Sequence, residues 1–520
     1  MYNRGMNFKR NLKSIITLIC SVFVVSGCTR GNTFSKFEFF DPIKDLGQVE
    51  DKHEDEVFAD GAYTKYGNYA SYVAKNSVGK NVELGSSYEV LYKYGGSHIM
   101  KSEGKRNIFV LPVQFEDFTV EDLGVSQEEY ISNLKKAFFG VAKNNRYVSV
   151  SEYYNRSSYG KLQISGMVCE DFYTFPYSVE YIIDNDSESK IVSDCYKKIT
   201  SSFIPKHYPF VNFSDYQIES GEMTVYLVYT YPTELKQNTK VFWDFTFSEI
   251  PMSWSSYSCL NTIAGEPDAH TLIHETGHLL GLPDYYPKVE SDPDPTARID
   301  MMDCSVGDHS GFSKMFYDWA RPYHVTDSCE ITISSLTNYG DLILINDKWN
   351  QTVFDEYYLI EFYTPSGLNN FDSNIGNNKA KLPLLPGIKI YHVDARLGYF
   401  QNKTVTSSKD DRIFKGYCDV VGSDDPNKTT GNVDYAHTNS KIGSDSTRPT
   451  YNLYELQLKG VTAVQDACAT DENLYRKGDT FEITPEKFNK TPNASSYKIT
   501  VTDINYRTAT LKIESTKAAE

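Results

Sequence analysis

The chain has 520 residues, enough for two or three domains that each bury a core, and 40% of them are hydrophobic and 23% charged. This composition is ordinary for globular protein and excludes wholesale disorder. The net charge of −17 disfavours a nucleic-acid partner, because phosphate binding needs clustered Lys and Arg, and no dense basic run follows the N-terminus. The 40 Tyr and 29 Phe favour a β-rich component.

Residues 1–28 have the pattern of an export signal. Basic residues precede an apolar run from Ile15 to Val25, about half the length of the roughly 20 residues that cross a bilayer. The small residues Ser26 and Gly27 before Cys28 resemble the bacterial lipoprotein box, which implies that Cys28 becomes the lipidated first residue of the mature protein. We therefore expect a lipid anchor on the extracellular face of a bacterial membrane or envelope. A plain secretory signal and an uncleaved anchor are the alternatives.

The region after the signal, residues 29–104, is expected to be an acidic tether and N-terminal segment, because it opens with a polar, acidic stretch. Beyond it, strands and helices mix. Alternation and helical spacing predict strands at 107–115, 223–229 and 240–247, and helices at 127–139, from Ser149 onward, and at 188–202.

After about Val325 the sequence pattern changes to short predicted strands that are separated by Asn, Gly, Asp and Ser. Examples begin at Asp341, Tyr357, Gly387 and Tyr497. We expect residues 326–520 to form one or more β-rich, sandwich-like domains, with a long loop insertion at about 407–451. The predicted fold class is α+β.

Seven cysteines remain when Cys20 and Cys28 are set aside with the signal, so at least one thiol is unpaired. Their spacings contain no Cys-x-x-Cys pair, which argues against both a disulfide scaffold and a cysteine-bound zinc. We expect most of them to pack as small buried hydrophobes.

The most informative segment is 267–286, where Pro267 suits the first turn of a helix and Gly281 suits its end. His274 and His278 are four residues apart, so they project from one face and can reach one metal ion. Glu275 beside them is placed to take a proton from water at that ion rather than to bind it. The pattern predicts a zinc site.

The residues after the helix supply a third ligand. Gly281 can adopt the left-handed conformation that turns the chain back beneath the helix, which would bring Asp284 to the metal. Two His and one carboxylate leave a fourth position for water, as a catalytic zinc requires.

Three other histidines are interpreted as non-ligands. His270 is also four residues from His274, but ligands at three successive turns would spread over about 12 Å, so a surface or supporting position is favoured. His309 and His392 have no neighbouring motif and are expected to be structural.

The segment from His274 to Tyr285 resembles the zinc signature of the immune inhibitor A family of secreted bacterial metalloproteases, relatives of the metzincins. Further stretches resemble other parts of that family between Asn107 and Asp394, among them 108–115, 149–162, 299–303, 311–319, 356–361 and 386–394. The resemblance implies a metzincin-like zinc peptidase domain at residues 105–325. It also implies a methionine turn with Met302 beneath the metal.

By this resemblance the chain is expected to be a zinc metalloendopeptidase that cleaves extracellular proteins or peptides, with Glu275 as the catalytic base. Ca²⁺ is implied as a possible structural ion, with Asp292 and Asp294 as candidate ligands against a reading as solvated loop charges. Where several metzincins have an oxyanion-binding tyrosine, this chain has Cys304. The oxyanion donor is therefore unassigned, and Tyr285 and Tyr286 are candidates or packing residues.

The alternative function is a catalytically inactive surface adhesin or glycan-binding lipoprotein built on a protease-like fold. The intact His-Glu-x-x-His with Asp284 argues against it, because a dead enzyme gains nothing from keeping the general base.

Overall fold

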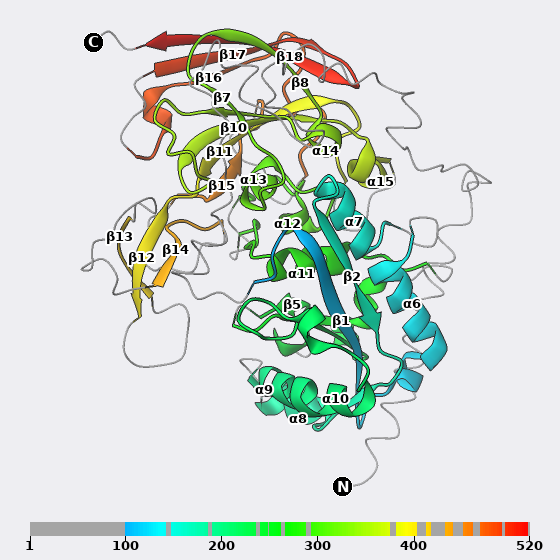
Figure 1. Cartoon of the computed structure of the whole chain (residues 1–520). Helices are drawn as coiled ribbons and strands as arrows, with labels where there is room; N and C mark the ends of the chain where they lie inside the picture. Colours follow the sequence, from blue (N-terminus) through cyan, green and yellow to red (C-terminus); the bar gives the residue numbers. More distant parts are fainter. Residues whose placement is uncertain are drawn as a thin grey trace, which may run out of the picture. The chain divides into compact units, whose positions relative to one another are not determined.

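The computed structural model describes residues 99–141, 147–185, 190–235, 240–247, 249–261, 266–287, 293–374, 381–402, 412–417, 432–439, 451–460, 468–490 and 495–517. This part of the chain is mixed α/β with several sheets (Figure 1). The predicted signal peptide with Cys28, the acidic tether, Asp292 and Cys418 lie outside it. Within it, no helix has both the length and the apolar character that crossing a membrane requires.

The first sheet carries the elements that surround the candidate site. Its main path is β2 (Leu162–Val168), β1 (Gly104–Phe115), β4 (Val225–Tyr229), β6 (Met252–Ser256) and β5 (Phe245–Thr246), and β3 (Tyr173–Phe175) also pairs with β1. All these pairings are parallel except that of β5, which runs antiparallel to β6. The strand predicted at 107–115 is confirmed as part of β1, whose apolar run is buried on both faces.

The strand predicted at 240–247 is wrong for most of its length. Residues Lys240–Phe242 form a 3-10 turn, and only Phe245 and Thr246 join the sheet. The reason is that hydrogen bonds with β6 hold residues 241 and 244 in other positions. Trp254 Nε1 donates to the Val241 carbonyl at 2.8 Å, and the Asp244 carboxylate accepts from Ser256 N at 2.8 Å.

Three helices cover one face of this sheet: α6 (Gln127–Phe139), α7 (Val150–Ser157) and α11 (His270–Leu279) (Figure 1). The predictions of α6 and of the start of α7 are confirmed, because the Ser126 and Ser149 side chains cap them, at 3.1 Å and 3.2 Å from the amides three residues on. The opposite face includes Phe109, whose ring contacts those of Tyr208 and Tyr216. The helix predicted at 188–202 is found as α9 (Lys190–Lys198), which continues as a π-helical turn over Ile199–Phe203.

The second half of the chain contains two sheets that share a core. One has five strands, β15 (Tyr454–Leu456), β11 (Gly387–Asp394), β10 (Glu356–Tyr363), β9 (Leu342–Ile345) and β7 (Tyr323–Val325). The other has four, β16 (Thr480–Ile483), β17 (Ser495–Ile504), β18 (Thr508–Lys517) and β8 (Cys329–Ser334). Ile360 and Ile390 of the first belong to one hydrophobic cluster with Ile499 and Leu511 of the second. The β-rich character predicted for this half is therefore present.

The insertion predicted as loop at about 407–451 contains regular structure. β13 (Arg412–Tyr417) and β14 (Asn432–Tyr435) both pair with β12 (Leu397–Asn402) in a three-stranded antiparallel sheet. The turn-forming residues that suggested a loop lie between these strands, in a part of the insertion outside the described residues.

A second hydrophobic cluster joins the two halves of sequence. It includes Ile108 of β1, Leu272 of α11, Leu359 of β10 and Tyr454 of β15. A hydrogen bond also joins the two halves, since Tyr147 Oη donates to the Leu368 carbonyl at 2.8 Å. The elements around α11 are thus packed against strands from the second half of the chain.

The six cysteines in the described part of the chain are all free. Cys169 and Cys195 are buried, as expected for small hydrophobes, whereas the other four are half-buried. The expectation of burial therefore holds for two of them.

A buried lysine side chain links α13 (Gly311–Phe316) to α7 and to Asp308. Lys314 Nζ, fully enclosed, donates to Asp308 Oδ2 at 2.7 Å and to the Ser157 carbonyl at 2.8 Å. We predict that Lys314→Met lowers the free energy of unfolding by about 3–5 kcal/mol, because it leaves the Asp308 charge buried without its partner. Urea denaturation measures the change. Lys512→Met, which removes one member of an exposed pair with Glu514, is the control and should leave the midpoint nearly unchanged.

Candidate metal centre

The helix α11 carries the predicted motif, and it begins later than expected. Its first residue is His270, and Pro267 lies before it, so the assignment of Pro267 to the first turn is wrong. Asp268 marks the start instead, since its carboxylate accepts from the His270 amide at 3.1 Å. The predicted stop is confirmed: Gly281 has φ +96°, and the chain folds back so that Leu282 N donates to the Gly277 carbonyl at 3.1 Å.

The two motif histidines turn the same ring nitrogen toward one point. His274 Nδ1 donates to the Met301 carbonyl and His278 Nδ1 to the Leu282 carbonyl, both at 2.7 Å. Each Nε2 then lies 3.1 Å from Asp284 Oδ1. The ligand atoms of His274, Glu275 and His278 all lie within 4.8 Å of one another. All four residues predicted for the site are therefore brought together.

The donor set suits a zinc ion. Two imidazole nitrogens and one carboxylate oxygen are zinc ligands, and at bonds near 2.0–2.1 Å the ligand atoms of a tetrahedral ion lie about 3.3 Å apart. The 3.1 Å distances from Asp284 Oδ1 to both Nε2 atoms are close to that spacing. The carbonyls that accept from the Nδ1 atoms would keep a proton on Nδ1 when zinc binds, so that each Nε2 can give its lone pair to the ion.

Glu275 lies beside the ligand atoms with only 4% of its surface exposed. Its Oε2 accepts from the Thr246 hydroxyl on β5, at 3.0 Å. Burial raises the pKa of the Glu275 carboxyl, while His278 and His274 act in the opposite direction. A carboxylate that is buried but kept beside two imidazoles is suited to accept a proton near neutral pH.

Met302 packs beneath this helix. A Cβ atom added at Gly277 would lie 2.5 Å from Met302 Sδ, so the sulfur sits against the turn between His274 and His278. The amide of Met302 donates to Asp300 Oδ1 at 2.8 Å, which caps the short helix α12 (Met301–Cys304). The residue predicted for the methionine turn is thus adjacent to the site.

The two tyrosines after Asp284 have different surroundings. Tyr285 is fully buried, and its hydroxyl is 2.9 Å from Ser313 Oγ, which accounts for it as a packing residue. Tyr286 is 37% exposed, and its ring lies nearly parallel to that of His274 with 6.5 Å between centroids. Cys304 is half-buried, and burial raises the pKa of its thiol.

His270 supports the helix and is not at the surface. Its side chain is buried, and its ring stacks on that of Tyr147. Nδ1 contacts the Asp268 carboxylate, and Nε2 lies 3.1 Å from Asp372 Oδ2. Burial opposes its charge, yet the two carboxylates raise its pKa to about 10. Asp372 comes from α15 (Asn370–Asn374), so this buried bridge links α11 to the second half of the chain.

Neither of the other two histidines belongs to the cluster of His274, Glu275 and His278, and the prediction that they are structural stays a prediction. His309 is buried in a group of aromatic rings that includes Tyr154 and Trp319, and burial holds its pKa well below the usual range. His392 Nε2 lies 2.9 Å from Glu356 Oε1, and its ring stacks on Tyr358.

Asp294, the one candidate calcium ligand in the described part of the chain, is held in its own loop. Its Oδ1 accepts from Thr296 N at 3.1 Å. Burial raises the pKa of the neighbouring Asp303 carboxyl well above its usual range, and Asp294 raises it further. These two carboxyls are close enough either to share a proton or to face a cation.

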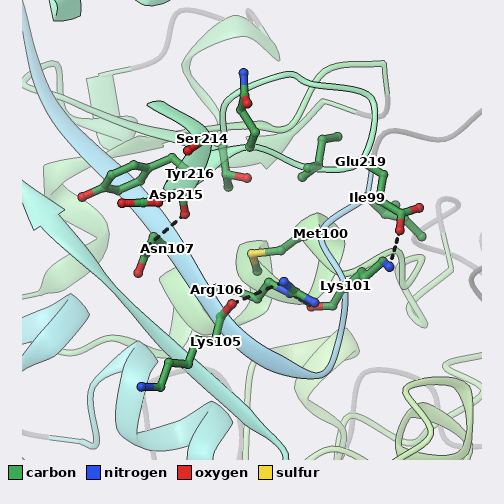
Figure 2. A pocket seen from close by; sticks show the side chains of 13 residues that line it. Ile99, Met100, Lys101, Lys105, Arg106, Asn107, Ser214, Asp215, Tyr216 and Glu219 are labelled. Atoms are coloured by element: carbon green, nitrogen blue, oxygen red, sulfur yellow. Dashed lines mark hydrogen bonds and ion pairs between the residues drawn. The ribbon is translucent and has the colours of Figure 1, made fainter. Parts of the chain in front are cut away.

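A pocket of about 450 Å³ lies near the start of β1, apart from the motif side chains (Figure 2). Several of its polar and charged groups already have protein partners. Lys101 pairs with Glu219, and Arg106 Nε donates to the Lys101 carbonyl. Asn107 Nδ2 donates to the Asp215 carbonyl at 3.0 Å. We assign no function to this pocket.

Zinc binding is predicted to release a proton from His278. Burial lowers the pKa of His278, but Asp284 outweighs it and raises the value to about 9, so the ring is protonated at pH 7. Zinc needs the Nε2 lone pair, and binding should release about one proton per ion at pH 7 and fewer as the pH passes about 9. Calorimetry in buffers of different ionisation enthalpy measures this number.

The raised pKa of His278 also makes the folding stability of the zinc-free protein depend on pH. The folded-state pKa of His278 is raised from 6.5, so its stabilising contact with Asp284 is complete below about 6.5 and is lost as the pH rises through about 9. A proton release near zero at pH 7 would contradict both the predicted release on zinc binding and the predicted pH dependence of stability. His392→Gln, far from the motif in sequence, is the control and should bind zinc with the same release.

Comparison with known proteins assigns no family to the chain: no protein-family model matches it, and no curated protein matches it significantly in sequence. The inference about function therefore depends on the four converging side chains and on their surroundings.

Proposed function

We propose that the chain is a zinc-dependent endopeptidase that cleaves extracellular proteins or peptides. One observation carries the proposal: His274 Nε2 and His278 Nε2 both lie 3.1 Å from Asp284 Oδ1, with the Glu275 carboxylate buried beside them. His274, His278 and Asp284 would hold the ion, which supplies Lewis acidity toward a peptide carbonyl and makes water more acidic.

Glu275 would act as the base. Its carboxylate accepts a proton from the attacking water and then passes that proton to the nitrogen of the leaving amine. Since Thr246 occupies Oε2, the other oxygen is the one suited to the water. Tyr286, half-exposed with its ring beside His274 and its side chain hydrogen-bonded to Asp284, is the candidate donor to the oxygen of the carbonyl under attack, since Tyr285 is fully buried.

The strand β5 supports an extended peptide as substrate. Among the residues that the structure describes, β5 pairs with β6 alone, and its Thr246 contacts Glu275. A substrate chain could add to the free edge as a further strand, which would bring a peptide bond near the base. This favours cleavage within unstructured polypeptide.

We also propose the finer features that the resemblance implies. Residues 105–325 would be the metzincin-like peptidase domain, with Met302 as the residue of its methionine turn, and residues 326–520 the β-rich part. A structural Ca²⁺ near Asp294 belongs to the same proposal. The position of Met302 against Gly277 supports the methionine assignment.

The decisive substitution is Glu275→Gln. It keeps the shape of the side chain but removes the proton acceptor and no proposed metal bond, so the protein should hold about one zinc and lose activity by at least about 10²-fold. Zinc is measured by mass spectrometry and activity by cleavage of casein. His274→Ala is the matched variant and should lose zinc and activity together.

Two outcomes would overturn the proposal. Glu275→Gln protein that retains zinc and cuts casein at the normal rate would exclude Glu275 as the base. Wild-type protein that binds zinc but cleaves no polypeptide would favour the inactive binding protein instead.

For location, we propose a lipid anchor on Cys28 at the extracellular face of a bacterial envelope. Cys28→Ala should release the protein from the membrane fraction or leave its precursor uncleaved, because the acylated side chain is gone. Fractionation followed by immunoblotting detects either result. Mature Cys28→Ala protein that stays in the membrane fraction would refute the anchor.

A further inference from the structure

The Thr246 side chain touches the proposed base twice and a second hydroxyl once. Its Oγ1 lies 2.9 Å from the Glu275 carbonyl oxygen, 3.0 Å from Glu275 Oε2 and 2.7 Å from Ser253 Oγ. Thr246 and Ser253 are directly opposite one another in the antiparallel pair of β5 and β6. Ser253 is fully buried.

The chemistry of these groups sets the direction of the hydrogen bonds. A carboxylate and a carbonyl only accept, so the single hydroxyl proton of Thr246 points toward Glu275. Thr246 Oγ1 can then accept from Ser253, which makes a chain that runs from Ser253 through Thr246 to Glu275. We propose that this chain makes Thr246 a positioning residue, which holds the Glu275 carboxylate in the orientation needed for proton transfer.

The geometry favours positioning over general structural support. Threonine is branched at Cβ, so its hydroxyl has few available orientations, and the contact with Ser253 selects one of them. The Thr246 hydroxyl contacts both the backbone carbonyl and the carboxylate of Glu275, and this fixes the Glu275 side chain relative to α11. Since the role concerns the base, it rests on the proposed peptidase function.

The test compares Thr246→Val, which replaces the hydroxyl by a methyl group, with Thr246→Ser, which keeps the hydroxyl. We expect Thr246→Val to lower kcat by about 10-fold to 100-fold with KM and zinc content unchanged, as for loss of one hydrogen bond to a charged group. Thr246→Ser should restore most of kcat. Thr332→Val is the control, because it removes a hydroxyl from an exposed cross-strand pair with Thr510 and should leave kcat unchanged.

A second measurement does not use activity. In the metal-free protein, Thr246→Val should lower the Tm more in the wild-type background than in a Glu275→Ala background, since only the former loses a bond to the carboxylate. Ser253→Ala gives an independent variant should Thr246→Val fold poorly. It leaves the Thr246 hydroxyl in place but removes the group that orients it, so kcat should fall by a smaller factor.

The outcomes separate this inference from the proposed function. Wild-type protein that cleaves casein while Thr246→Val has the same kcat, or additive Tm shifts in the two backgrounds, would overturn the positioning role alone. A wild-type protein without zinc-dependent cleavage would overturn the peptidase proposal, and the positioning role with it.

Discussion

The burial of a helix that carries ionisable side chains is the constraint on which the rest of this structure depends. His274 and Glu275 on α11 are 6% and 4% exposed, and an unpartnered polar group in such a place costs free energy that packing alone does not return. The surrounding elements supply the partners. Tyr154 Oη donates to the Ile273 carbonyl and Tyr317 Oη to the Gly277 carbonyl, which adds to the bonds within the helix.

These partners come from both halves of the chain. Asp372 accepts from the Gly307 amide at 2.7 Å as well as facing His270, and Glu361 Oε2 accepts from the Gly311 amide at 2.8 Å. The β-rich half thus holds the start of α11 and the segment that follows the site. This half does more than cover a surface, because the Asp372 carboxylate on α15 faces and stabilises the charge of His270, which α11 could not bury otherwise.

The sequence predicted best what is decided locally. The strand at 107–115 and the helix at 127–139 follow from apolar periodicity and a serine cap, and the spacing of His274 and His278 fixes their common face. Gly281 was predictable for the same reason, since the turn it makes depends on its own φ angle. The convergence of the motif with Asp284 follows from these local features.

What the sequence did not predict depends on distant partners. Thr246 lies in a strand of two residues without a clear pattern, and Asp372 is 102 residues from the histidine it faces. The error at 240–247 has the same origin, because Val241 and Asp244 are hydrogen-bonded to Trp254 and Ser256 on β6. The start of α11 was misplaced since proline at a first turn is a preference and Asp268 offered a competing start.

The close approach of Met302 to Gly277 has a consequence for how the motif can vary in evolution. Any side chain at position 277 would place its first carbon 2.5 Å from the methionine sulfur and 3.4 Å from the Tyr154 hydroxyl. Gly277, the second of the two variable places in His-Glu-x-x-His, is therefore not free to vary while methionine occupies position 302. In descendants of this chain the two positions should change as a pair, with a larger residue at 277 tolerated only beside a smaller one at 302.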